Sequence, residues 1–229
     1  MLTRTFRALA LVTVTLLAGG CKAFGGSFLL FGGSHTPQED LVSKARAAER
    51  ESVETREDFA AAFLSYQRLT APQALELEKL CDEFEDAVDA CENRSEDLDD
   101  RIETIRREKE ELVKDWTEEL EHFTSDAVRK KSAVQMQETD ARAQRLLDAL
   151  EKLQGRMKPV LLKLQDYRLF FDHNLNARAI ATLQDTYKEF DAECKALESE
   201  IGKAQGEIAA FLAYFVELSP PKPAAQASK

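Results

Sequence analysis

The most constraining feature of the sequence is a hydrophobic repeat near its C-terminal end, in which steps of three and four residues alternate. The repeat holds for six heptads, from Ile180 to Leu218. A sustained 3.5-residue period is typical of helices that pack with a left-handed supercoil. Its members are Ile180, Leu183, Tyr187, Phe190, Cys194, Leu197, Ile201, Ala204, Ile208, Phe211, Phe215 and Leu218. We therefore expect one long helix here, packed against partner helices.

Three earlier helices are predicted by the same rhythm. The first begins at the cap Thr36-Pro37 with Glu39 completing a capping box, and reaches about Leu69. The second is expected over 72–122 and the third over 126–173, with a kink at Pro159. The predicted core positions are Leu41, Ala45, Ala48, Phe59, Phe63 and Tyr66, then Leu77, Cys81, Phe84, Val88, Cys91, Leu98, Ile102, Ile105, Leu112 and Trp116, then Met136, Thr139, Ala143, Leu146, Leu150, Leu153, Met157, Leu164 and Tyr167.

These patterns predict an all-α fold: an elongated antiparallel helical bundle with coiled-coil packing, long helices and short turns, over residues 36–218. In up-down-up-down order, the turns at 69–72 and 173–177 lie at one end of the bundle. The turn at 123–126 and the C-terminal tail lie at the other end. A second helix of this length predicts a rod whose tip stands roughly 70–80 Å from that end.

The N-terminus has the pattern of a lipoprotein signal peptide. Two Arg residues precede the apolar run Ala8–Leu17, and three small residues, Ala18–Gly20, stand immediately before Cys21. The run is about half the length needed to span a bilayer. We expect residues 1–20 to be removed and Cys21 to carry acyl chains as the first residue of the mature protein. The alternative is an ordinary cleaved signal with an incidental thiol.

Segments of unusual composition flank the predicted bundle. Residues 21–35 mix Gly with Phe and Leu, which indicates a flexible lipid-anchored linker or an aromatic segment that dips into the membrane interface. Residues 219–229 are rich in Pro and are expected to be a disordered tail. Lys22, rather than Asp, follows the lipidated Cys, which favours the outer membrane, with the protein facing the periplasm.

The charge of the chain limits its partners. The chain has 31 basic and 42 acidic residues. Without Arg4 and Arg7 the mature chain keeps 29 basic residues, a net charge near −13. Such a surface repels nucleic acid and anionic lipid head groups, so attachment to a membrane would depend on the acyl chains on Cys21. The acidic run 82–100, with Arg94 as its one base, is a solvated helix face, a loose binding surface for divalent cations without the spacing of a calcium loop, or a docking surface for a basic partner.

The most specific polar segment is the run from His173 to Arg178, with the sequence His-Asn-Leu-Asn-Ala-Arg. The structural interpretation is a tight interhelical turn with Asn176 as helix cap, because Asn suits both a helix end and an N-cap. The functional interpretation is a partner-binding tip formed by His173, Asn174, Asn176 and Arg178.

The cysteines of the predicted bundle raise one disulfide hypothesis. Cys91 and Cys194 both lie 19 residues beyond the same end of the rod, on the core stripes of two helices. They are therefore expected at similar height, and we consider a Cys91–Cys194 disulfide, which a periplasmic location would permit. The alternative is that both are buried free thiols acting as small apolar residues.

Catalytic and metal-binding motifs are missing from the sequence. It contains no Cys-x-x-Cys, no His-Glu-x-x-His, no Gly-rich phosphate loop and no nucleophile elbow. We therefore predict no enzyme activity, no catalytic residues, no metal site and no cofactor.

One segment resembles a known family. The run from Phe171 to Gln184, together with the Lys158-Pro159-Val160 step and the acidic second helix, is similar to bacterial lipoproteins grouped as domain of unknown function 2959. The resemblance covers roughly residues 38–218. It implies a helical, lipid-anchored protein, and it brings no known activity or site residues.

Two functions of different classes are consistent with these patterns. The first is a lipid-anchored periplasmic coiled-coil rod, a structural or adapter protein whose tip or acidic flank contacts an envelope protein or peptidoglycan. The second is a helical module that binds a lipid or another apolar ligand between its helices. The sequence is also consistent with a homo-oligomer, because a coiled-coil stripe packs equally well on helices of the same chain or of another copy.

Overall fold

The structure is a computed structural model that describes residues 37–71 and 75–218. The predicted signal peptide, the lipidation site Cys21, the linker and the tail at 219–229 lie outside these residues. The elements are α1 (Pro37–Leu69), α2 (Leu77–Leu120), α3 (Asp126–His173), α4 (Ala177–Ala181), a 3₁₀ helix η1 (Thr182–Asp185) and α5 (Tyr187–Leu218). None of the described residues forms a strand. The predicted all-α bundle of long helices is confirmed.

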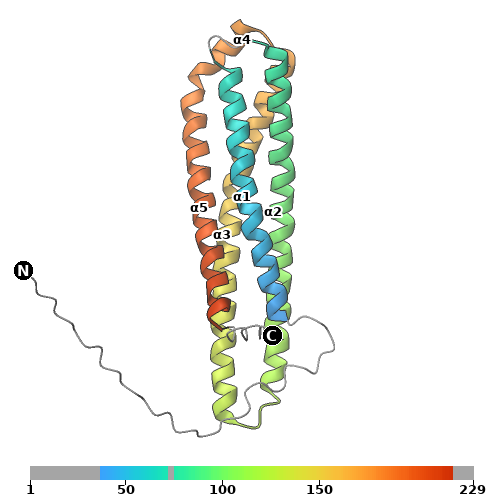
Figure 1. Ribbon diagram of the computed structural model, residues 1–229, viewed down its shortest axis with the longest axis vertical. Coiled ribbons are helices and arrows are strands. Elements are labelled where there is room, and N and C mark those ends of the chain that lie inside the picture. Colours follow the sequence, from blue (N-terminus) through green and yellow to red (C-terminus); the bar gives the residue numbers. More distant parts are fainter. Residues whose placement is uncertain (1–36, 72–74, 219–229) are drawn as a thin grey trace, which may run out of the picture. The chain divides into compact units, whose positions relative to one another are not determined.

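The helices form a ring of four (Figure 1). α1 packs on α2, α2 on α3, α3 on α5, and α5 returns to α1. α4 and η1 lie at the end where α1 stops and α5 starts, whereas α1 starts and α5 stops towards the other end. Each helix therefore runs antiparallel to its neighbours in the ring, as in an up-and-down bundle.

The first and third helices begin and end close to the predicted residues, and the second does not. α1 starts at Pro37, where the missing N–H of proline costs nothing in a first turn. α2 starts at Leu77, five residues after the predicted start at Pro72. Glu76, which precedes it, has a φ of 57° in the left-handed region that side chains disfavour. α2 therefore begins later than predicted, which leaves residues 70–76 between the two helices.

The predicted long C-terminal helix is interrupted. The residues of the predicted helix form α4, η1 and α5 instead. The heptad repeat therefore lies on one continuous helix only within α5. The hydroxyls of Thr182 and Thr186 donate to the carbonyls of Ala179 and Leu183, at 2.6 and 2.8 Å. Threonine hydroxyls that bond to nearby carbonyls compete with regular helix geometry, which accounts for the break.

The predicted core positions are largely buried and form one cluster along the bundle. Leu77, Trp116, Phe63, Tyr167, Tyr187, Cys194, Leu183 and Phe215 are partly buried and pack against it. Between Ala48 and Phe59 the stripe of α1 continues with two buried hydroxyl residues, Ser52 and Thr55. Their hydroxyls bond to carbonyls of the same helix, Glu49 and Glu51, both at 2.7 Å, which allows their burial.

α2 and α3 extend beyond the start of α1 and the end of α5 (Figure 1). α2 has 44 residues and α1 has 33, so they extend about 66 and 50 Å at 1.5 Å per residue. No residue between 113 and 138 is buried, which distinguishes this end of the α2–α3 hairpin from the rest of the bundle. We call residues 113–138 the protruding hairpin end. Measured along α1, the tip therefore lies about 50 Å from the start of that helix. This is shorter than the distance predicted from the length of the second helix.

Candidate functional site

The turn between α3 and α4 holds the four predicted tip residues together. α3 ends at His173, and the N–H of Asn174 donates to the carbonyl of Phe171 at 3.2 Å. The Asn174 amide donates to the carbonyl of Phe170 at 3.0 Å. Asn176 caps α4 by accepting from the N–H of Ala179 at 3.0 Å. The structural interpretation, a tight turn with Asn176 as cap, is confirmed.

These bonds divide the four residues into two kinds. Both asparagine side chains are engaged in holding the turn. His173 and Arg178 are exposed, and the described part of the chain provides neither with an ion pair. The tip therefore offers an imidazole and a guanidinium on a turn fixed by its own hydrogen bonds. Whether a partner binds there stays a prediction.

An aromatic layer lies directly beneath the tip. Tyr66, Phe84, Tyr167, Phe171 and Phe190, drawn from all four long helices, have ring centroids 4.6 to 6.3 Å apart. Such tilted and edge-to-face pairs add to the burial of the rings and stiffen this end of the bundle.

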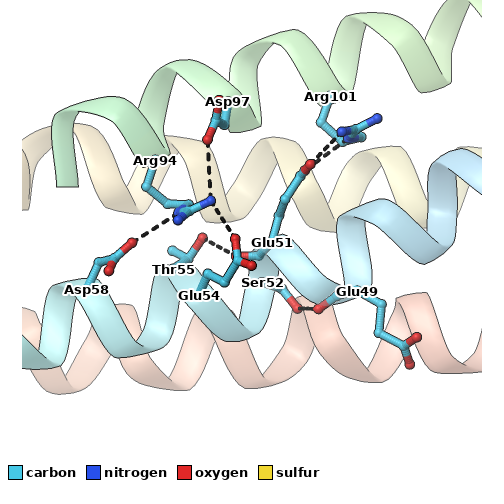
Figure 2. Close-up of polar contacts among 9 residues, drawn as sticks. All are labelled: Glu49, Glu51, Ser52, Glu54, Thr55, Asp58, Arg94, Asp97 and Arg101. Atoms are coloured by element: carbon cyan, nitrogen blue, oxygen red, sulfur yellow. Dashed lines mark hydrogen bonds and ion pairs between the residues drawn. The ribbon is translucent and has the colours of Figure 1, made fainter. Parts of the chain in front are cut away.

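A polar cluster joins α1 to α2 halfway along the bundle (Figure 2). Arg94 donates to Asp58 at 3.0 Å and forms ion pairs with Glu54 at 2.7 Å and Asp97 at 3.3 Å. Glu51 lies one turn before Glu54 on α1, and Arg101 lies two turns beyond Arg94 on α2. Both carboxylate oxygens of Glu51 accept hydrogen bonds from the Arg101 guanidinium. The two arginines therefore fix how α1 and α2 are aligned along their axes.

The charges of this cluster stabilise one another. Burial of the Arg94 guanidinium lowers its pKa. The hydrogen bond to Asp58 and the neighbouring carboxylates have the larger, opposite effect, so the pKa of Arg94 is raised. The hydrogen bond to Glu51 raises the pKa of Arg101 in the same way. Both guanidiniums stay charged, so the cluster is a persistent set of ion pairs with a structural role.

The acidic run 82–100 is only partly a solvated face. Glu83 pairs with Arg68 of α1, while Asp89 and Glu92 both pair with Arg168 of α3. Lys158 of α3 lies 3.3 Å from Asp99. Because several of these carboxylates bind bases of neighbouring helices, the run contributes to packing as well as to surface charge.

The described cysteines are free thiols. Burial raises the pKa of Cys91 far above its ordinary value and that of Cys194 to about 12. A negative charge on Cys194 would raise the pKa of Cys91 further. Cys91 is buried and Cys194 is partly buried against the core, which fits the role of small apolar residues. The Cys91–Cys194 disulfide stays a prediction.

A pocket of about 340 Å³ opens between α1 and α5. Its apolar lining is Phe59, Ala60, Phe63, Leu64, Cys194, Leu197 and Ile201. Arg56 stands at its edge, where a Cβ on Gly202 of α5 would lie 3.7 Å from the Arg56 Nη2. In the described residues Arg56 has no ion-pair partner, whereas Lys195, which also lines the pocket, is paired with Asp191 at 2.7 Å. The sequence pattern missed this pocket because it assigned the same aromatic residues to the core.

The sequence of the bundle matches one known family. Residues 33–215 match the family described as "Protein of unknown function (DUF2959)". The chain belongs to this family. The DUF2959 match begins just before α1 and ends three residues before the end of α5, so the family segment and the four-helix ring coincide. The suspected resemblance is confirmed.

Other comparisons add no relative to this DUF2959 chain. Neither a curated protein nor a solved structure shows significant similarity to it. None of the helices in the described ranges carries an apolar run long enough to cross a bilayer.

Proposed function

We propose that this chain is a lipid-anchored coiled-coil protein of the cell envelope, a non-enzymatic structural or adapter protein whose tip contacts a partner. The anchor would be acyl chains on Cys21, after removal of residues 1–20. Lys22 favours the outer membrane, with the bundle in the periplasm. The partner would be an envelope protein or peptidoglycan.

The observation that carries this proposal is the position of the tip relative to the start of the bundle. α1 leads from Pro37 to the tip over 33 residues, about 50 Å, and α5 returns over 32 residues. A protein held at its N-terminus would present residues 173–178 at the far end of the bundle. An adapter needs a rigid spacer with its contact surface at the distal end, and this arrangement supplies both.

The chemistry of the tip supports contact with an anionic or polar partner. His173 and Arg178 are exposed, in a chain whose surface is otherwise strongly acidic. Because Asn174 and Asn176 already hold the turn, a partner would meet a preformed surface and little ordering entropy would be lost on binding.

A site-specific crosslink tests the proposal. A photoreactive residue in place of Lys188, which is exposed in the first turn of α5 at the same end of the bundle, should capture one discrete envelope protein or muropeptide from intact cells. The same residue in place of Glu121, in the turn between α2 and α3, should not capture that species. Loss of the crosslink on adding His173→Ala would assign recognition to the tip, whereas identical products from both positions would contradict the adapter proposal.

The pocket between α1 and α5 favours a second candidate, a module that binds an apolar ligand. Its volume lies at the lower end of the range for small-molecule pockets, and its apolar lining with Arg56 at one edge suits an acyl chain with an anionic head group. On this proposal the α1–α5 face, and not the tip, is the functional surface.

A thermal-shift measurement tests the second candidate. A long-chain fatty acid should raise the melting temperature, because a ligand stabilises the state that binds it. Leu64, 55% exposed in the pocket lining, is the residue to change, and Leu162 of α3, 61% exposed, is the matched control. The shift should disappear in Leu64→Glu and persist in Leu162→Glu. No shift in the unaltered protein would exclude this ligand class.

A further inference from the structure

Three potential metal ligands converge where α2 begins and α3 ends. Cys81 and Glu85 are one turn apart on α2, and Asp172 lies in the last turn of α3. One ligand atom from each, the Cys81 Sγ and a carboxylate oxygen of Glu85 and of Asp172, lies within 4.8 Å of the other two. The sequence could not reveal this group, because Asp172 is 87 residues away from Glu85 and only the bundle brings them together.

The Cys81 side chain belongs to the hydrophobic core cluster, yet its sulfur lies near two carboxylates. Its residue is only 6% exposed, and the described residues give the thiol no hydrogen-bond partner. Its sulfur faces two carboxylates, although an apolar side chain at this position would avoid charge. A buried, unpartnered sulfur directed at two acids is a donor available for coordination.

Among the described residues, no Lys, Arg or His side chain forms an ion pair with Glu85 or Asp172. Carboxylate oxygens of Glu85 and Asp172 lie within 4.8 Å of each other, so two negative charges face each other at this site. Arg168 is the nearby cation, but its guanidinium is engaged by Asp89 at 2.6 Å and Glu92 at 3.0 Å. Paired carboxylates are stable when they share a proton or bind a cation between them.

We propose that Cys81, Glu85 and Asp172 form a binding site for a divalent transition metal of the zinc class. A thiolate with two carboxylates is a donor set that Zn²⁺ accepts, whereas Ca²⁺ and Mg²⁺ prefer oxygen ligands alone. Three protein ligands leave a fourth position for water. On binding, the Cys81 Sγ and the carboxylate pair release their protons to solvent, so affinity increases with pH.

The bound metal would act on the tip. It would link the first turns of α2 to the last turn of α3, one residue before His173. The metal would therefore hold the turn at 174–176 against the bundle, and the proposal is independent of the lipid anchor.

Cobalt titration of the full-length chain tests the site. Co²⁺ should bind with one saturating equivalent and produce a thiolate-to-cobalt charge-transfer band, which Zn²⁺ should abolish by displacement. Cys81→Ser should remove the band. Cys21→Ser, Cys91→Ser and Cys194→Ser are the matched thiol controls and should each retain it. Absence of the band in the unaltered chain, or its persistence in Cys81→Ser, would overturn the proposal.

The carboxylates provide a second test that leaves the core untouched. Asp172 is exposed, so Asp172→Asn should fold, and its dissociation constant for Zn²⁺ in calorimetry should rise at least about tenfold. Asp86→Asn removes the same charge from the exposed residue beside Glu85 and should leave the constant unchanged. Equal effects of the two changes would show that only the general acidic surface attracts the metal, and would also overturn the proposal.

Discussion

The hydroxyl of Tyr66 lies in the aromatic layer without a hydrogen bond of normal geometry. Tyr66 is fully buried, with the side chains of Thr186 and Tyr167 beside its oxygen. Burial raises its pKa, as expected where the phenolate would lose its hydration. Because Thr186 and Tyr167 form no hydrogen bond of normal geometry with this hydroxyl, they compensate little of the free energy that is lost when the hydroxyl leaves water.

Tyr66→Phe should therefore stabilise the protein. Removing an unsatisfied buried hydroxyl should raise the free energy of unfolding by about 1 kcal/mol, or the melting temperature by about 2–4 °C. Calorimetry measures the change. Tyr66→Leu is the control: it also removes the hydroxyl but breaks the ring contacts, and should destabilise. A loss of stability in Tyr66→Phe would mean that the hydroxyl has a partner.

The pairing of Arg94 with Asp58 should contribute more than an exposed ion pair. Their side chains are 20% and 25% exposed, and Arg94 contacts two further carboxylates. A double-mutant cycle with Arg94→Met and Asp58→Asn in urea should give a coupling of about 1–2 kcal/mol. The pair Lys203 and Glu200 on α5 is the reference, with an expected value of about 0.3–0.5 kcal/mol. Equal couplings would mean that the cluster does not fix helix alignment.

Asp172→Asn should also change how stability depends on pH when a chelator is present. The folded state raises the pKa of Glu85, so its stabilising contribution is complete below the unfolded pKa of about 4.3. That contribution is lost as pH rises through the raised folded pKa. The gain in melting temperature from Asp172→Asn should therefore be larger at pH 7 than at pH 4. A gain that is the same at both pH values would contradict the interaction of the two carboxylates.

At the scale of elements, the protruding hairpin end is the weakest part of the bundle. Within the part of the chain that the structure describes, no residue of 113–138 is buried, and the Trp116 Nε1–Ser132 Oγ hydrogen bond at 2.8 Å is one link between the two helices. The position of Arg142, 4.2 Å from the ring centroid of Tyr214, marks contact between α3 and α5 just beyond it.

Hydrogen exchange should reveal this difference. Backbone amides of residues 113–138 should exchange faster than those of 143–164, because local opening there breaks fewer buried contacts. Mass spectrometry of peptides from the two segments measures it. Ser132→Ala should accelerate exchange near Trp116 without affecting 143–164. Equal protection in both segments would imply that another chain covers the hairpin end.

The helices were predictable from sequence because their apolar residues repeat at a constant period and their ends carry caps. Asn176 is the clearest case, since the residue type alone indicated its role. The start of α2 was not predictable, because Glu76 occupies a left-handed conformation that its residue type disfavours. The break before α5 was not predictable, because the heptad pattern of the sequence continues through the residues at which the helix is interrupted. The ligand group at Asp172 and the pocket at Leu64 depend on which helices become neighbours, which periodicity does not specify.

At the scale of the whole molecule, the proposed lipid anchor makes attachment to membranes depend on one atom, the Cys21 Sγ. Cys21→Ala should prevent acylation and move the protein from the membrane fraction of a cell to its soluble fraction. On the same proposal, the acidic surface repels anionic lipid and does not replace the acyl chains. Fractionation with immunoblotting measures the distribution. Cys91→Ala is the control and should stay with the membrane; a membrane-bound Cys21→Ala protein would refute the anchor.

The ring order of the helices has a consequence for how the chain can be connected. Two of the four neighbouring pairs join helices that follow each other directly in sequence, a third joins α3 to α5 across the short α4 and η1, and the fourth brings α1 beside α5. A short new linker from the end of α5 to the start of α1 would therefore close the ring. The chain could then be opened between Ala71 and Leu75, which gives a circular permutant with its termini at the tip and every helix pair retained.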